Sequence, residues 1–187
     1  MAQKRKDWNG LISGFKASDL VFLDESGCNT DMTRRYAYSL GGSRAVDSAP
    51  LSKPKNTTIL PSIQLDGTLR YTTFSGGTTV ERFKRYLETD LLPHLNGNSV
   101  LIMDNMKSHH ARAVRNLLDS SEVRCIYLPP YSPDLNPIEK LWSKVKAFLR
   151  KFKARTLDAL PNAIQNAFHS VTISDCSGWF RFCGYAL

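Results

Sequence analysis

The chain has 187 residues, of which 42% are hydrophobic and 22% are charged. This composition excludes a disordered chain and is typical of one globular domain with a core of its own. Lysine and arginine together number 25 against 17 acidic residues, so the formal net charge is +8. A positive surplus of this size favours a polyanionic partner, although charge alone does not identify one.

No apolar run approaches the length of a membrane span, and the basic start is not followed by an apolar stretch with a cleavage site. We therefore expect a cytoplasmic protein that does not associate with membranes. The cysteines are scattered and form no CxxC pair, which favours free thiols over a zinc site or a disulfide. They are Cys28, Cys125, Cys176 and Cys183.

The amino-terminal half predicts mainly strands. Residues 1–19 are expected to form a basic, exposed lead-in with a short helix, and residues 20–187 to form the folded domain. An apolar run at 20–24 predicts a buried strand. Further strands are predicted at 34–42 and, joined by a hairpin turn at Asp66-Gly67, twice within 57–74. Pro61, inside the first strand of this hairpin, indicates an edge position or a bulge.

The carboxy-terminal half alternates helices with strands. A helix capped by Thr78 or Thr79 is expected to end at Pro93. Two apolar runs predict strands at 99–104 and 123–128. Further helices are predicted at 108–118, from the 131–142 stretch to about Arg155, and at 157–168, before a compact aromatic tail. The order is three or four strands with antiparallel links, followed by helix, strand, helix, strand and helix. It predicts an α/β fold with a mixed five-stranded sheet flanked by helices.

Two acidic residues follow the most continuously apolar strands. Asp24 ends the run at 20–24, and Asp104 ends the run at 99–104. Such strands are typically central and parallel, which places their ends about 5 Å apart at one edge of the sheet. Carboxylates this close repel each other unless a cation lies between them, and their hard oxygen atoms suit Mg²⁺ or Mn²⁺. The alternative is that each acid merely begins a turn.

The stretch YSPDLNPIEKLW, residues 131–142, fixes the start of a helix. Asn136 is suited to cap the helix, and Pro137 to fill its first position, where no N–H donor is needed. Glu139 then lies in the first turn at the border of the apolar face, from which it can reach the sheet edge as a third metal ligand. A glutamate that only caps helix N–H groups is the alternative.

The same predicted helix is strongly basic, because residues 140–155 contain seven lysine or arginine residues and no acid. Lys146, Arg150 and Lys153 continue the border that begins at Glu139. A basic border leading away from an acidic site favours a phosphate backbone along the helix, and a solvated basic face is the alternative. The candidate DNA contacts are Lys140, Lys144, Lys146, Arg150 and Lys153.

Three segments, LVFLDESG, VLIMDN…HH and LPPYSPDLNPIEKLWSKVK, resemble the catalytic core of mariner-type transposases, in particular their bacterial insertion-sequence relatives. The 34 residues between Asp104 and Glu139 match the Asp-Asp-Glu spacing of that group, and the resemblance covers about residues 20–183. It implies a ribonuclease-H-like fold and a cut-and-paste transposase. Such an enzyme cuts transposon ends and joins them to target DNA with two Mg²⁺ or Mn²⁺ ions.

By position, the resemblance implies that Asp24, Asp104 and Glu139 form the catalytic, metal-binding triad. Glu25 is a rival to Asp24, although alternation along a strand sends the two side chains to opposite faces. The two histidines of the second segment also fit the family pattern, as contacts to DNA or the metal shell or, equally, as capping or packing residues. The accessory candidates are Glu25, Asn105, His109, His110 and Asn136.

The resemblance also implies partners: the terminal repeats and target DNA, and a second copy of the chain in a synaptic complex at the bacterial nucleoid. Relatives carry helix-turn-helix modules before the core, whereas about 19 residues precede the first strand here. We therefore expect a separate or frameshifted product to supply end recognition, unless the chain is a fragment. The rival hypotheses are another two-metal nuclease of this fold and a non-catalytic DNA-binding regulator of transposition.

Overall fold

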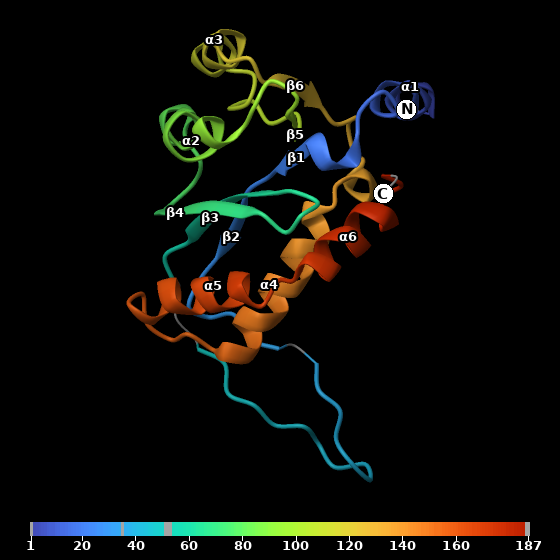
Figure 1. The fold of residues 1–187 in the computed structure, drawn as a ribbon. Helices are drawn as coiled ribbons and strands as arrows, with labels where there is room; N and C mark the ends of the chain where they lie inside the picture. Colours follow the sequence, from blue (N-terminus) through green and yellow to red (C-terminus); the bar gives the residue numbers. More distant parts are fainter. Residues whose placement is uncertain (1, 35, 51–53, 186–187) are drawn as a thin grey trace.

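The computed structural model describes residues 2–34, 36–50 and 54–185. Its centre is a mixed six-stranded sheet in the order β2-β3-β1-β5-β6, with β4 paired along β3 (Figure 1). The strands are β1 (Leu20–Leu23), β2 (Ser26–Cys28), β3 (Thr57–Ile63), β4 (Leu69–Ser75), β5 (Val100–Met103) and β6 (Arg124–Tyr127). The predicted α/β class is confirmed, with six strands where five were expected.

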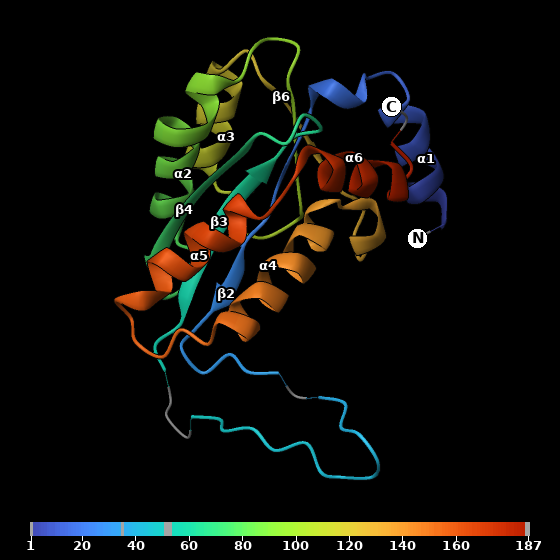
Figure 2. The same ribbon diagram turned by 60° about the horizontal axis from the view of Figure 1, so that its bottom comes forward.

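Helices cover both faces of this sheet. In Figure 2, α2 and α3 lie on one face, and α4 and α5 lie on the other, with α6 and α1 beyond them. The helices are α1 (Ala2–Ile12), α2 (Val80–Tyr86), α3 (Arg112–Ser120), α4 (Ile138–Phe152), α5 (Ala159–His169) and α6 (Ile173–Phe182). Among the helices of the described residues, none is long and apolar enough to cross a membrane.

The central strands are apolar on both faces because each face contacts a separate core. Leu20 and Phe22 of β1 pack into the core beneath α4, α5 and α6, whereas Val21 and Leu23 pack into the core beneath α2 and α3. β5 follows the same alternation and pairs in parallel with β1. The prediction that these two runs are central, parallel neighbours is confirmed. The four cysteines are free thiols.

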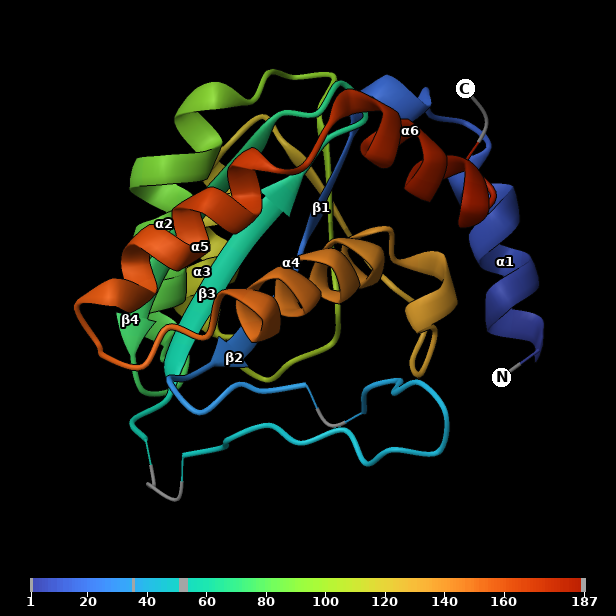
Figure 3. The same ribbon diagram turned by 90° about the horizontal axis from the view of Figure 1, so that it is seen from below.

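The predicted strand at 34–42 is wrong. Its described residues form no strand and belong to a long arm, residues 29–56, whose described parts run out from the sheet and back (Figure 3). The side chains of Tyr36 and Tyr38 are at least 90% exposed. The alternating pattern is local, and a strand forms only where a partner strand accepts its hydrogen bonds. The short β2 supplies that pairing beside β3 instead.

Pro61 marks neither an edge strand nor a bulge, because β3 pairs with β4 residue by residue through Pro61↔Tyr71. β3 lies inside the sheet, between β4 on one side and β1 with β2 on the other. The Pro61 carbonyl accepts the Asp24 N–H at 3.4 Å, so the proline nitrogen faces the break between the end of β1 and the start of β2. At this break the missing N–H donor removes no ladder hydrogen bond, which explains how an interior strand tolerates proline.

The helix predictions differ from the structure mainly at their ends. Thr79 caps α2 as predicted, accepting the Arg82 N–H at 3.3 Å. α3 begins at Arg112, four residues after the predicted start, because residues 106–111 form hydrogen-bonded turns. The aromatic tail contains a helix that the prediction missed, α6, which begins with a Thr172–Asp175 capping box.

The lead-in is a helix that packs on the domain rather than an exposed segment. Trp8 on α1 is 3% exposed and lies in the same core cluster as residues of α4 and α6. Arg5 forms an ion pair with Asp134, and the Tyr185 hydroxyl donates to the Leu135 carbonyl at 2.5 Å. Both ends of the described chain therefore brace the turn that precedes α4.

Replacing Trp8 with alanine tests whether α1 packs into the core of the domain. The substitution should lower the free energy of unfolding by about 3 kcal/mol, since it empties a buried aromatic site. Leu11→Ala is the matched control, because Leu11 lies on the same helix but is 49% exposed, and it should cost less than about 1 kcal/mol. Urea unfolding would measure both. Equal losses would contradict the assignment of Trp8 to the core.

Candidate active site

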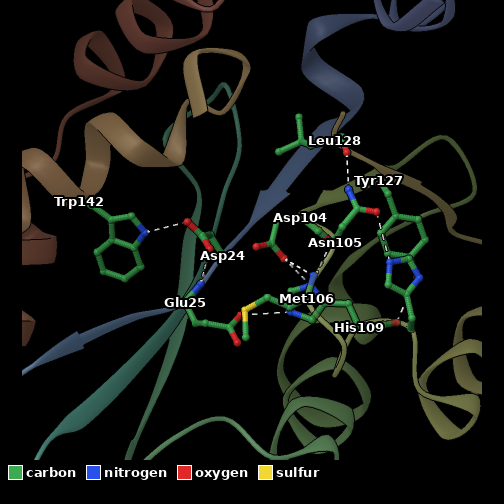
Figure 4. Close-up of polar contacts among 10 residues, drawn as sticks. Asp24, Glu25, Asp104, Asn105, Met106, His109, Tyr127, Leu128 and Trp142 are labelled. Carbon is green, nitrogen blue, oxygen red and sulfur yellow. Dashed lines mark hydrogen bonds and ion pairs between the residues drawn. The ribbon is translucent and has the colours of Figure 1, made fainter. Parts of the chain in front are cut away.

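Two carboxylates lie side by side where β1 and β5 end. Leu20, Val21 and Phe22 pair in register with Val100, Leu101 and Ile102, so the strands finish at the same edge of the sheet. Asp24 follows β1 directly, and Asp104 follows β5. The predicted adjacency of these strand ends is confirmed. Figure 4 shows the two side chains extending from neighbouring strand ends.

A cleft of about 460 Å³ opens at this edge. Its walls include all three acids that the sequence singled out, Asp24, Asp104 and Glu139, together with Asn105 and Asn136. Within the described residues, no three acidic, histidine or cysteine side chains lie close enough together to enclose a metal ion. The acids therefore face one cleft from its different walls.

The conformation of the turn before α4 directs Glu139 to the cleft. Tyr131 adopts a left-handed conformation with φ 55°, and Pro133–Leu135 form a 3-10 turn. Asn136 is extended and its side chain accepts the Ile138 N–H at 3.4 Å, while Pro137 already has helical dihedral angles. Asn136 thus caps α4 as predicted, with the helix boundary shifted by one residue.

Asp24 is held from two directions. Its Oδ1 accepts the Glu25 N–H at 2.8 Å, and its Oδ2 accepts the indole N–H of Trp142 at 3.2 Å (Figure 4). Burial, together with the charges of Glu139 and Asp104, raises the pKa of Asp24 to about 7, against the lowering by these two hydrogen bonds. The three acids are therefore close enough for their charges to interact.

Trp142 is a site residue that the sequence pattern assigns only to the apolar face of the helix. Its indole ring is buried, and a buried indole N–H needs an acceptor because it can only donate. It lies three residues after Glu139, within one helical turn. In the sequence, the only sign of this role was a tryptophan on the predicted apolar face, one helical turn after Glu139.

Asp104 is held through a single oxygen. Its Oδ1 accepts the Met106 N–H at 3.0 Å and lies 2.9 Å from His109 Nδ1. In Figure 4 the other carboxylate oxygen points to the side of Asp24. Burial alone raises the pKa of Asp104, but the hydrogen bonds from His109 and Met106 outweigh it and hold the pKa below its ordinary value.

His109 lies between two carboxylates. Its Nε2 is 3.1 Å from Glu25 Oε2, and its ring is fully buried and stacked on Phe83 at a centroid distance of 4.3 Å. Burial lowers the pKa of His109, but the hydrogen bonds to Asp104 and Glu25 have the larger, opposite effect. The pKa is therefore raised to about 9. His109 is therefore an imidazolium at neutral pH, and it is too deeply buried to contact DNA directly.

Glu25 turns away from the cleft, as strand alternation predicts for the neighbour of Asp24. It does not line the cleft, its side chain is 9% exposed, and its Oε2 contacts His109. Among the two acids that follow β1, the geometry places only Asp24 in the cleft with Asp104 and Glu139.

Asn105 and His110 connect the cleft to β6. The Asn105 side chain donates to the Leu128 carbonyl at 2.6 Å, and its oxygen lies 3.3 Å from His110 Nε2. His110 stacks on Tyr127 at a centroid distance of 4.2 Å. Both residues therefore have packing and hydrogen-bonding partners that fix the wall of the cleft.

The basic residues of α4 divide between two sides of the helix. Lys144 pairs with Asp175 at 2.5 Å, and Lys140 lies 3.8 Å from the ring centroid of Phe182, so both face α6. Lys153 pairs with Asp47 of the arm at 2.6 Å. Lys146 Nζ lies 5.8 Å from the ring centroid of Trp142, and Arg150 lines a hollow between α4 and the arm.

The family model of DDE superfamily endonucleases matches residues 19–161. The chain belongs to this family, and the resemblance to mariner-type transposases inferred from the motifs is confirmed. The Tc1 transposase of Caenorhabditis elegans is 30% identical over 97 residues, which are 50% of this chain and 36% of that protein.

Solved structures of Mos1 transposase share the fold. Its paired-end complex with the left transposon end matches with a TM-score of 0.80 at 19% identity, over 95% of this chain and 57% of that chain. Its catalytic domain with Raltegravir and Mg matches with a TM-score of 0.71 at 18% identity, over 95% and 86%. The expected ribonuclease-H-like fold is thereby confirmed. The chain spans little more than half of the Mos1 chain and about a third of the Tc1 protein.

Asp24→Asn should stabilise the protein when it is stripped of metal with EDTA. The pKa of Asp24 is raised in the folded state, so ionisation of Asp24 reduces stability as pH rises from about 4 to about 7. The asparagine variant lacks this penalty and should be more stable by about 1–3 kcal/mol at pH 8, with the difference shrinking at pH 5.

Asp134→Asn is the control with the opposite sign, because its ion pair with Arg5 lowers the pKa of Asp134. That variant should not gain stability at pH 8. Urea unfolding in EDTA at both pH values makes the comparison. An Asp24→Asn variant less stable than the parent at pH 8 would contradict the buried, repelled state assigned to this carboxylate.

Proposed function

We propose that this chain is the catalytic core of a DNA transposase that cuts transposon ends and joins them to target DNA. Asp24, Asp104 and Glu139 are the proposed catalytic and metal-binding residues. The observation that carries the proposal is that these three acids, from two parallel strand ends and one helix start, line a single cleft in a member of the DDE superfamily endonucleases.

The residues of the cleft fit a divalent cation such as Mg²⁺ or Mn²⁺. All three side chains offer hard carboxylate oxygens. Burial, together with the charges of Glu139 and Asp104, raises the pKa of Asp24, and a bound cation would favour its ionised form. Solved Mos1 structures contain Mg or Mn. By analogy we propose two ions per site, held by Asp24, Asp104 and Glu139.

The chain's own contribution is to fix the positions of its acids. Asp24 and Asp104 stand at the ends of paired strands, while Glu139 approaches from a capped helix start. The Trp142 indole and the His109 ring orient the two aspartates. When bound, the metal ions would activate the attacking water or 3′-hydroxyl and neutralise charge on the scissile phosphate. Hydrolysis and strand transfer would then use the same arrangement of carboxylates.

DNA is the proposed partner, and α4 is its proposed docking element. Lys146 and Arg150 are the favoured contacts, because Lys144 and Lys153 are already engaged in ion pairs and Lys140 packs on Phe182. Mos1 has been solved in complexes with transposon-end DNA. We further propose that a helix-turn-helix segment reads the end sequence, that a homodimer pairs the two ends, and that the protein works at the bacterial nucleoid.

Conservative removal of each carboxylate tests the catalytic assignment. Asp24→Asn, Asp104→Asn and Glu139→Gln should each slow cleavage of linear DNA bearing the element's ends by about a thousandfold or more. Each removes a charge that helps hold the metal, and several kcal/mol of charge stabilisation are at stake, with a tenfold change in rate for every 1.4 kcal/mol.

Cleavage would be measured with Mg²⁺ and with Mn²⁺, and circular dichroism would verify folding. Asp158→Asn, which changes an acid before α5 outside the cleft, should keep the parent rate. Full activity in any one triad variant would remove that residue from the triad. Cleavage without joining to a second DNA would identify a nuclease rather than a transposase, and binding without cleavage would identify a regulator.

Changing Lys146 and Arg150 to alanine should weaken DNA binding to a similar extent for all sequences. The slope of log affinity against log salt should flatten by about 0.9 for each duplex phosphate that the variant no longer neutralises. Lys84→Ala and Arg85→Ala on α2, on the opposite face of the sheet, remove equal charge and should leave the slope unchanged. Equal slopes for both double variants would mean that the border of α4 is only a solvated face.

A further inference from the structure

A chain of three contacting side chains, Glu25, His109 and Asp104, extends from the cleft into the protein. His109 contacts Glu25 through Nε2 at 3.1 Å and Asp104 through Nδ1 at 2.9 Å. The histidine side chain is 0% exposed and the glutamate side chain 9% exposed. This chain connects a residue that does not line the cleft to a carboxylate that does.

Both the ring and the backbone carbonyl of His109 have partners in the structure. Phe83 stacks on the ring, and the Tyr127 hydroxyl donates to the His109 carbonyl at 3.1 Å. Its Nδ1 also lies 3.2 Å from the Asp104 carbonyl oxygen, so the ring faces both the backbone and the side chain of Asp104. The stacked Phe83 and the contacts at both ring nitrogens hold the imidazole in place, so it restricts the orientation of the Asp104 carboxylate.

A buried glutamate at position 25 destabilises the fold more than an apolar residue would if the position served only for packing. Within the described structure its Oε1 is buried without a hydrogen-bond partner, while Oε2 contacts His109. Burying a carboxylate and an imidazolium removes their hydration, which costs free energy. A well-packed apolar pair would not incur this cost. A requirement at the cleft explains this cost better than stability does.

The contacts on Asp104 indicate what that requirement is. His109 and the Met106 N–H both contact Oδ1, and the other oxygen points to the side of Asp24. A carboxylate anchored through one oxygen presents the other in a fixed direction. Removing a residue that orients a metal ligand in this way typically changes metal affinity or activity by about 10–100-fold.

We propose that Glu25 and His109 are a positioning pair that holds the Asp104 carboxylate in the orientation needed to bind a divalent cation. This inference rests on the proposed function, since it assigns Asp104 to the metal site. In it Glu25 anchors the ring and touches no metal, and His109 acts only through Asp104.

Two substitutions of Glu25 separate this role from that of a direct metal ligand. Glu25→Gln keeps an oxygen that can contact His109, so it should change the Mn²⁺ dissociation constant by much less than tenfold. Glu25→Ala removes the anchor and should raise the constant about tenfold or more, as should His109→Gln. The full chain would be titrated with Mn²⁺ alone, and free Mn²⁺ would be followed by its electron paramagnetic resonance signal.

Val114→Ala is the matched control for stability. Val114 is fully buried on α3 in the core cluster that contains Phe83, and its apolar side chain can make no hydrogen bond to the three residues of the chain. Its substitution should lower the melting temperature without moving the Mn²⁺ constant. The two Glu25 variants alone distinguish a positioning role from a direct metal ligand, even if His109→Gln does not fold.

The outcomes are distinct. Loss of Mn²⁺ binding in Glu25→Gln as complete as in Glu25→Ala would make Glu25 a ligand and overturn the proposal. Parent-like Mn²⁺ binding in Glu25→Ala would make the pair purely structural and also overturn it, while leaving the proposed function intact. A parent chain that neither binds Mn²⁺ nor cleaves DNA would instead contradict the proposed function itself.

Discussion

The parallel, in-register pairing of β1 with β5 is the constraint on which the rest of the site depends. It ends two buried strands at one edge of the sheet and brings Asp24 and Asp104 together there. Because side chains alternate along a strand, a slip of one residue would exchange the two core faces and turn both sets of apolar side chains the wrong way. The separate cores on the two faces of the sheet therefore hold the register, and the register holds the carboxylates.

The third acid depends on a different kind of constraint. Glu139 is placed by a capped helix start, and the turn before it is braced by contacts from both ends of the described chain. Trp142 joins the two arrangements, because it lies on the same helix as Glu139 and donates its N–H to Asp24. The strand edge and the helix start are thus directly connected, and a disturbance of α4 would reach both walls of the cleft.

Much of this architecture was predictable from local pattern. Two apolar runs that each end in aspartate, and the Asn136-Pro137 start of α4, follow from rules that act over a few residues. What the sequence did not reveal depends on distant partners. Examples are the absence of a partner strand for the described residues of 34–42, the break between β1 and β2 opposite Pro61, and the contacts of Trp142 and His109. The histidine was noticed, but its burial between two carboxylates from separate strands is a property of the folded chain.

We propose that the cleft between these strand ends binds the divalent metal ion required for DNA cleavage. Anomalous X-ray scattering from crystals soaked in Mn²⁺ tests it most directly, because it locates the ion without assuming any activity. We expect an anomalous peak in the cleft, within coordination distance of Asp24 and Asp104 and beside Glu139. A peak at Glu25 or elsewhere on the chain, with the cleft empty at saturating Mn²⁺, would contradict it.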